Sequence, residues 1–227
     1  MSSEFIHLRV HSDFSMMDGL NKVKPLLDEC VKQEMPAIAL TDQMNMCGLV
    51  KFYSEAHNRG IKPIIGTDFW VQDLSQSDDI FRLTLLATNN DGYKNITVLI
   101  SKAYQRGHVN HLPVIDKDWL IEHQAGVIIL SGATRGDVGQ ALVKNNLKGA
   151  QQMAAFYQTH FPDRYYLELI RTGRSNENAY IKAAVNFAQE HDLPVVATNE
   201  VCFISPDNFA AHEIRVSIHD GYTLEDS

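Results

Sequence analysis

The chain has few of the features that mark secreted, membrane-spanning or disulfide-stapled proteins. Its three cysteines, Cys30, Cys47 and Cys202, are odd in number and form no C-x-x-C pair, a usage typical of a reducing compartment. No apolar run approaches the length that crosses a bilayer, and the N-terminus turns polar within its first four residues. We therefore expect a cytoplasmic protein with no membrane partner.

Positive charge and flexible linkers are also scarce. The 227 residues contain 20 Lys and Arg against 28 Asp and Glu, which gives a formal net charge of -8. A surface that holds a phosphate backbone through bulk electrostatics needs clustered Lys and Arg, so any nucleic-acid contact of this chain would be local. No Pro/Gly/Ser-rich stretch divides the chain, and we expect residues 1–227 to form one domain.

Short apolar runs alternate with amphipathic stretches along the chain. The runs predict seven strands, at Phe5–Val10, Ala37–Leu40, Pro63–Ile65, Arg82–Ala87, Val127–Leu130, Tyr165–Ile170 and Pro194–Ala197. Apolar residues at three-to-four spacing predict helices at Val23–Gln33, Leu49–Asn58, Gly92–Gln105, Gly136–Val143, Ala150–His160, Asn176–Glu190 and Phe209–His219. This alternation predicts an α/β protein with a parallel sheet, either a closed barrel or an open doubly wound sheet.

Polar residues follow most of the predicted strands and favour the barrel. They include His11, Thr41-Asp42-Gln43, Thr67-Asp68, Ser131-Gly132, Arg171-Thr172-Gly173 and Thr198-Asn199-Glu200. In a closed βα barrel these positions converge on the mouth at the C-terminal ends of the strands. In an open sheet they would spread along an edge, with only a switch-point crevice in common.

The first predicted strand ends in an altered metal motif. A His-x-His pair would place two imidazoles on one face of a strand, because side chains alternate with period two. Here the first position is Arg9 and the second is His11. A guanidinium keeps its proton in proteins and cannot bind a metal ion. Taken alone, Arg9 and His11 could equally be ordinary residues of a half-buried strand.

Six strings, in order, carry a family resemblance. They are HLRVHSDFSMMDGL, AIALTDQMNMCGLVKFY, GIKPIIGTDFWV, LTLLATNNDGYKNITVLISKAYQRG, HFPDRYYLELIRTGR and LPVVATNEVCFI. Together they resemble the polymerase and histidinol phosphatase (PHP) domain family, and most closely the PHP domains that begin the alpha subunits of bacterial replicative DNA polymerases. The resemblance runs from residue 5 to Ser227 and implies a distorted seven-stranded βα barrel. It also implies that the chain is a fragment whose polymerase parts lie beyond Ser227.

Active members of this family hold three metal ions with nine side chains, and the resemblance maps these positions onto this sequence. Four positions carry residues that are no longer effective ligands: Arg9, Gln43, Arg82 and Ala133. Five positions keep a side chain that could still bind an ion: His11, Asp18, Asp68, Glu200 and Cys202. The resemblance thus implies a vestigial metal site, with no catalytic residue and no cofactor expected in this domain.

Two of the four losses introduce positive charge where the metal would sit. Carboxylates held close together without a metal repel each other, and a nearby cation removes that repulsion. Our hypothesis is that Arg9, with Arg82, replaces the metal as the counter-ion of Asp68 and Glu200. This arrangement would keep the barrel intact and abolish hydrolysis.

The resemblance favours an interaction and structural module over an enzyme. It implies that the domain stabilises a replicative DNA polymerase and binds the separate proofreading exonuclease subunit. Magnesium, nucleotides and DNA would be bound by the parent polymerase. The alternative is an active metal-dependent phosphoesterase or 3′–5′ exonuclease that uses the five remaining ligands. A third possibility is phosphate or sugar binding without catalysis, for which the glycine-rich run Ser131–Gly139 is a candidate, although a tight turn explains that run as well.

Overall fold

The path of strand β2 links two parts of the chain. The computed structural model describes residues 5–73, 79–109, 111–175 and 177–223. One part, here called the terminal part, comprises Met1–Ile65 with Glu200–Ser227, and the central part comprises Gly66–Asn199. Strand β2 (Lys62–Gln72) begins in the terminal part and ends in the central part.

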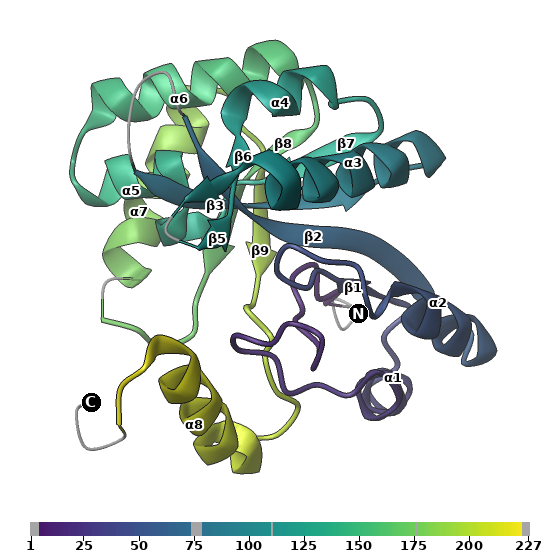
Figure 1. Cartoon of the computed structure of the whole chain (residues 1–227). Helices are drawn as coiled ribbons and strands as arrows, with labels where there is room; N and C mark the ends of the chain where they lie inside the picture. The colour runs from purple at the N-terminus through teal and green to yellow at the C-terminus, as the bar shows by residue number, and fades with distance from the viewer. Residues whose placement is uncertain (1–4, 74–78, 110, 176, 224–227) are drawn as a thin grey trace. The chain divides into compact units, whose positions relative to one another are not determined.

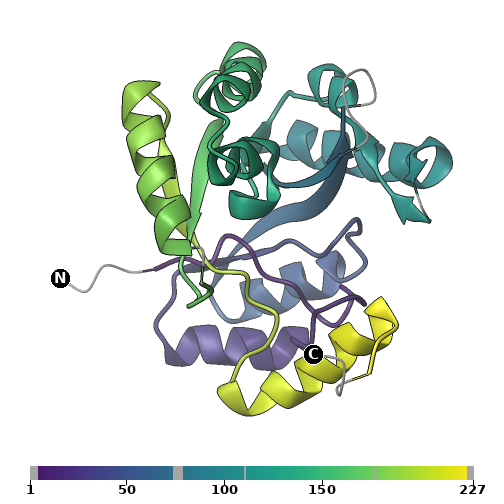
Figure 2. The ribbon, with the colours of Figure 1, turned by 90° about the vertical axis from the view of Figure 1, so that its left-hand side faces the viewer.

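The terminal part is built around one short parallel pairing. Strand β1 (Ala37–Leu40) pairs with the first residues of β2, in a register that runs from Ala37 opposite Lys62 to Leu40 opposite Ile65. Helices α1 (Val23–Lys32) and α2 (Leu49–Asn58) contact each other and contribute most of the apolar core. After the short helix η2 (Pro206–Asn208), helix α8 (Phe209–Asp220) completes this part and is the yellow helix in Figure 2.

The predicted first strand is an extended segment rather than a regular strand. Among residues 5–10, only Val10 forms a β-bridge, which is parallel and joins it to Val201. On the side facing β1, the N–H of Ala39 donates to the carbonyl of His7 at 2.8 Å. The N–H of Val10 donates instead to the hydroxyl of Thr41 at 2.9 Å. A side chain therefore takes a bond that the ladder of a regular strand would use.

The central part contains a curled sheet with helices around it. Its strands pair in the order β2, β3 (Ile80–Ala87), β7 (Val127–Leu130), β8 (Tyr165–Ile170) and β9 (Val195–Thr198), and β6 (Ile115–Asp116) also pairs with β2. Figure 1 shows the helices arranged along the outside of this sheet: α3 (Asn90–Arg106), α4 (Lys117–Glu122), α5 (Asp137–Val143), α6 (Leu147–His160) and α7 (Glu177–Glu190). The short strands β4 (His108–Val109) and β5 (Leu112–Pro113) form a separate hairpin.

The prediction of an all-parallel sheet was wrong for β3. Strand β3 runs antiparallel to both of its neighbours, β2 and β7. Only residues 73–79 connect β2 to β3, whereas a parallel connection needs a crossover of about a dozen or more residues. The other pairings, β1 with β2, β7 with β8 and β8 with β9, are parallel as predicted. Closure of the sheet into a barrel stays a prediction.

Strand β2 is also longer than its sequence pattern indicated. The prediction ended the strand at Ile65, so that Thr67 and Asp68 would follow it at the barrel mouth. In the structure the strand continues to Gln72, and Asp68 lies within it, opposite Thr84 of β3. The continuing pairing with β3 supplies hydrogen bonds that a short parallel strand would have lacked.

The helices are largely as predicted, with small shifts at their ends. The side chain of Asn89 accepts hydrogen bonds from two backbone N–H groups and begins α3 two residues earlier than predicted. Asn146 similarly begins α6 at Leu147. Position 176, where the helix 176–190 was predicted to begin, lies outside the described residues. In the part of the chain that the structure describes, no helix is both long and apolar enough to cross a membrane.

Asp42 fixes the segment that follows the first predicted strand. One carboxylate oxygen accepts from the backbone N–H of Ser12 at 2.6 Å, and the other accepts from the Ser12 hydroxyl at 2.8 Å. Burial raises the pKa of Asp42 to about 6, although the bonds from Ser12 oppose that shift. The side chain of Asp42 holds this segment through its bonds to Ser12. Its ionised form is disfavoured, because burial removes the hydration that a carboxylate has in water.

The raised pKa of Asp42 predicts a specific pH dependence of stability. Between about pH 4 and pH 6 the folded protein holds a proton at Asp42 that the unfolded chain has lost, so the free energy of unfolding falls as the pH rises. A shift of this size corresponds to a contribution of up to about 3 kcal/mol. We expect urea unfolding to show about 2 kcal/mol of this loss between pH 4.5 and pH 7 in the wild type, and Asp42→Asn to lack it. Equal losses in both proteins would mean that Asp42 titrates at its ordinary pKa.

Candidate functional site

Arg9 and Glu200 form a buried ion pair in the terminal part. The backbone N–H of Val201 donates to the carbonyl of Arg9 at 3.2 Å, which brings residue 200 beside the guanidinium. Arg9 Nη2 lies 3.3 Å from Glu200 Oε1, and the two side chains are 1% and 11% exposed. A guanidinium this deeply buried requires a nearby negative charge. The pair matches the part of the hypothesis that assigned Arg9 to Glu200.

His11, Asp18 and Gln43 meet around the carboxylate of Asp18. His11 Nδ1 lies 2.9 Å from each oxygen of Asp18. Gln43 Nε2 donates to Asp18 Oδ2 at 2.8 Å, and the hydroxyl of Ser15 donates to Oδ1 at 3.0 Å. The amide of Gln43, which the family resemblance maps onto a ligand position, thus uses acceptor capacity of Asp18 that a metal ion would otherwise need.

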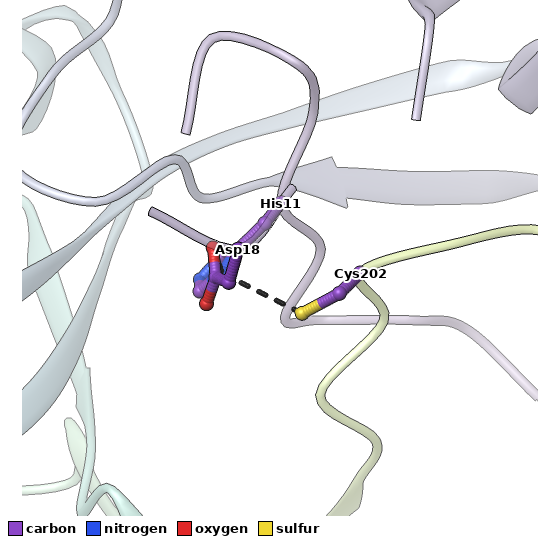
Figure 3. Close-up of side chains that lie close together, drawn as sticks. All are labelled: His11, Asp18 and Cys202. Carbon is purple, nitrogen blue, oxygen red and sulfur yellow. Dashed lines mark hydrogen bonds and ion pairs between the residues drawn. The ribbon is translucent and has the colours of Figure 1, made fainter. Parts of the chain in front are cut away.

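Cys202 completes a group of three possible ligands with His11 and Asp18. Their ligand atoms all lie within 4.8 Å of one another. Figure 3 shows the three side chains close together. Cys202 Sγ is 3.9 Å from His11 Nδ1. Burial raises the pKa of the Cys202 thiol, and its contact with His11 only partly opposes this effect. The thiolate is the form that binds metal, and the burial of Cys202 favours the protonated thiol, which does not.

The loop that carries Asp18 is held from two sides. Asn21 Nδ2 donates to the carbonyl of His11 at 2.9 Å, and the backbone N–H of Leu20 donates to the carbonyl of Cys202 at 2.8 Å. From helix α8, His212 Nδ1 lies 2.9 Å from the carbonyl of Asp18, and the Arg215 guanidinium donates to the carbonyl of Gly19. The sequence did not single out Asn21, His212 or Arg215.

Asp68 and Arg82 share one face of the β2–β3 pairing in the central part. Asp68 stands opposite Thr84, and Trp70 stands opposite Arg82, so all four side chains lie on the same face. The Thr84 hydroxyl donates to the Asp68 carboxylate. The Arg82 guanidinium lies over the Trp70 ring, 4.4 Å from its centroid, and both charged residues are 2% exposed. Asp68 and Arg82 are diagonal neighbours, a spacing that a long side chain can span.

Ala133, the predicted site position after Ser131-Gly132, carries only a methyl group and offers no ligand atom. Gly132 has a φ of +74°, and a β-carbon there would meet the carbonyl oxygen of Arg82 at 2.2 Å. The backbone of this turn therefore packs directly on strand β3. The adjoining helix α5 begins at Asp137, whose carboxylate accepts from the N–H of Val138 at 2.8 Å. Its negative charge occupies the place where a phosphate would bind, and the run 131–139 is explained by its tight turn.

Two buried charged groups were missed by sequence reasoning. Glu168 is fully buried in β8 and accepts a hydrogen bond from the Thr198 hydroxyl. The sequence could have indicated a buried carboxylate here, because Glu168 interrupts the apolar strand Tyr165–Ile170. Asp137 accepts from Lys117 Nζ and from the Tyr157 hydroxyl, each at 2.9 Å. The sequence does not indicate this cluster, since Lys117, Asp137 and Tyr157 lie on separate helices.

The nine predicted site positions therefore divide between the two parts. The terminal part holds six of them, which meet as described above: Arg9, His11, Asp18, Gln43, Glu200 and Cys202. The central part holds Asp68, Arg82 and Ala133. In both parts an arginine at one of these predicted positions is buried and contacts a carboxylate or an aromatic ring.

Curated relatives match nearly the whole chain. The DNA polymerase III subunit alpha of Vibrio cholerae is 62% identical over 223 residues, which cover 98% of this chain and 19% of the relative. The corresponding subunits of Escherichia coli and Pseudomonas fluorescens are 57% and 43% identical, over 98% and 100% of this chain and 19% of each relative. The chain therefore spans about a fifth of the length of the curated relatives it matches.

Solved structures with low sequence identity share the fold. A candidate metal-dependent phosphoesterase from Bifidobacterium adolescentis aligns with a TM-score of 0.56 at 12% identity, over 94% of this chain and 96% of the other. An amidohydrolase from Chromobacterium violaceum with bound sulfate and no metal aligns with a TM-score of 0.56 at 13% identity, over 92% and 96% of the two chains. Among protein families, the PHP domain matches residues 7–172. The α/β fold, the relatives and this match, which covers well over half of the chain, agree that the chain belongs to the PHP domain family.

Proposed function

We propose that this chain is the PHP domain of a replicative DNA polymerase alpha subunit, and that it does not hydrolyse phosphoesters itself. Its role is to stabilise the polymerase and to bind the proofreading exonuclease subunit. The observation that carries the proposal is the buried pair of Arg9 and Glu200. By family resemblance both residues stand at metal-ligand positions, and here they neutralise each other.

The donor set does not fit a cluster of metal ions. Metal-assisted hydrolysis needs about three protein ligands for each ion and an open position for water. In the terminal part the guanidinium of Arg9 adds positive charge beside Glu200, and the side chain of Gln43 donates to Asp18. Among the residues that the structure describes, only His11, Asp18 and Cys202 could converge on one ion.

Catalysis of DNA synthesis is assigned to polypeptide beyond Ser227. The relatives are DNA polymerase III alpha subunits about five times as long as this chain, which supports a parent that is a DNA-directed DNA polymerase. The magnesium ions, nucleotides and DNA would be bound by that remainder, in the cytoplasm. The net charge of -8 supports the same division, because it disfavours a general DNA-binding surface on this domain.

Removing Arg9 should destabilise the protein more than removing both members of its ion pair. Arg9→Met leaves the Glu200 carboxylate without this partner, and we expect the free energy of unfolding to fall by about 3 kcal/mol. Arg9→Met/Glu200→Gln removes both charges and should recover a substantial part of that loss. Denaturant unfolding of Arg9→Met, of Glu200→Gln and of the double variant measures the coupling free energy between the two side chains.

A surface arginine provides the matched control for this cycle. Arg59 is paired with Asp28 and Glu55 outside the core, so Arg59→Met should cause a clearly smaller loss. If the double variant loses the sum of the two single losses, Arg9 and Glu200 are not coupled, and the replacement of a metal by Arg9 is wrong.

The alternative function is an active phosphoesterase or 3′–5′ exonuclease, which the group of His11, Asp18 and Cys202 supports. We expect the purified protein to show no turnover of a generic phosphodiester or of single-stranded DNA, with zinc, manganese or magnesium supplied. Turnover that is abolished both by a chelator and by His11→Ala would mean that the chain is an active metal-dependent enzyme.

Binding of the exonuclease subunit should not depend on the residual ligand group. Titration of the folded protein with the proofreading exonuclease subunit of the same organism should give saturable binding by calorimetry. The affinity should be the same for His11→Ala and in the presence of a chelator, because docking uses the outer surface. Absence of binding to a folded sample would remove the docking role.

A further inference from the structure

Helix α8 turns a largely polar side toward the rest of the terminal part. Two of its charged or titratable residues, His212 and Arg215, bond to the carbonyls of Asp18 and Gly19. Ser217 is 4% exposed and donates to the carbonyl of Glu213 within the helix. A surface helix of a soluble protein normally turns its apolar side inward. In α8 the hydrogen bonds of His212 and Arg215 anchor this side, and ring contacts of Phe209 and His212 with Phe203 add to them.

The outward side of α8 carries an apolar stripe. Ile218 is 77% exposed, Ile214 is 45% exposed, and Ala211 is exposed one turn before them. Tyr222, just after the helix, is also 40% exposed. Ala211, Ile214 and Ile218 stand at i, i+3 and i+7, the spacing with which one helix packs against another. This apolar stripe is oriented for a partner outside the terminal part.

We propose that the apolar stripe of α8 packs against a helix of the polypeptide that follows Ser227. The inference rests on the proposal that the chain is part of a longer polymerase. The curated relatives are about five times as long as this chain, and α8 ends at Asp220, shortly before the last residue. A following segment is tethered beside the stripe from the moment it is made.

The small size of the stripe argues for a tethered occupant over a separate molecule. Stable complexes bury about 800 Å² on each partner, far more than the side chains of the stripe can supply. A covalently linked segment has a high effective concentration and needs much less contact area. Covering the stripe would also fix α8 and, through His212 and Arg215, the loop that carries Asp18.

Thiol labelling in the full-length chain tests the inference. In a background in which the exposed Cys47 is replaced by Ser, Ile218→Cys places a thiol on the stripe, and Lys51→Cys places one on the exposed side of α2 as the matched control. We expect a maleimide to label the thiol at position 218 at least tenfold more slowly than the thiol at position 51. Hydrogen exchange of the unsubstituted full-length chain should show matching protection of α8.

Three results would overturn the inference. Labelling of the two thiols at similar rates would mean that the stripe is exposed in the full chain. Protection that disappears on dilution would identify a second copy as the occupant, and protection that requires the exonuclease subunit would identify that subunit. The mass of the full-length chain tests its continuation beyond Ser227 separately, and the exonuclease titration tests docking, so that failure of this inference is distinguishable from failure of the proposed function.

Discussion

The charge of Arg9 is the constraint on which the site of the terminal part depends. A guanidinium that is 1% exposed and never deprotonates must keep an anion beside it. Glu200 supplies that anion, and the backbone bridge between Val10 and Val201 holds the two segments in register. The same bridge sets Cys202 beside His11. An ion pair thus fixes the geometry of a group of residues that resembles a metal site.

Much of the fold could be predicted from the sequence, because helices and buried strands carry strong periodic patterns. The bounds of β1, β7 and β8 match their apolar runs. The direction of β3 was missed, because the predicted strand ends left residues 66–81 between the two strands, enough for a crossover, whereas in the structure only residues 73–79 connect them. The length of β2 was also missed, because polar residues such as Asp68 look like the end of a strand. Pairing with β3 and burial on its face decide that point, and neither is written in the local sequence.

Residue type alone predicted which side chains of the site cannot bind a metal ion. The contacts that depend on how separate segments meet could not be predicted in this way. Arg9 could be excluded as a ligand from its residue type alone. The family resemblance named Asp68 and Glu200 as carboxylates that Arg9 and Arg82 could neutralise, and the structure pairs Arg9 with Glu200. The bond from Gln43 to Asp18 could not be foreseen, because it depends on how two loops meet. The support that α8 gives to the loop of Asp18 depends on tertiary contact in the same way.

The number of metal ions that the chain binds tests the central claim most directly, namely that an arginine ion pair has replaced the family's metal cluster. Native mass spectrometry of the protein supplied with zinc or manganese would count them. The account predicts at most one ion per chain, held by His11, Asp18 and Cys202 and absent from His11→Ala. Two or three ions per chain, with Arg9 and Glu200 unchanged in sequence, would contradict it.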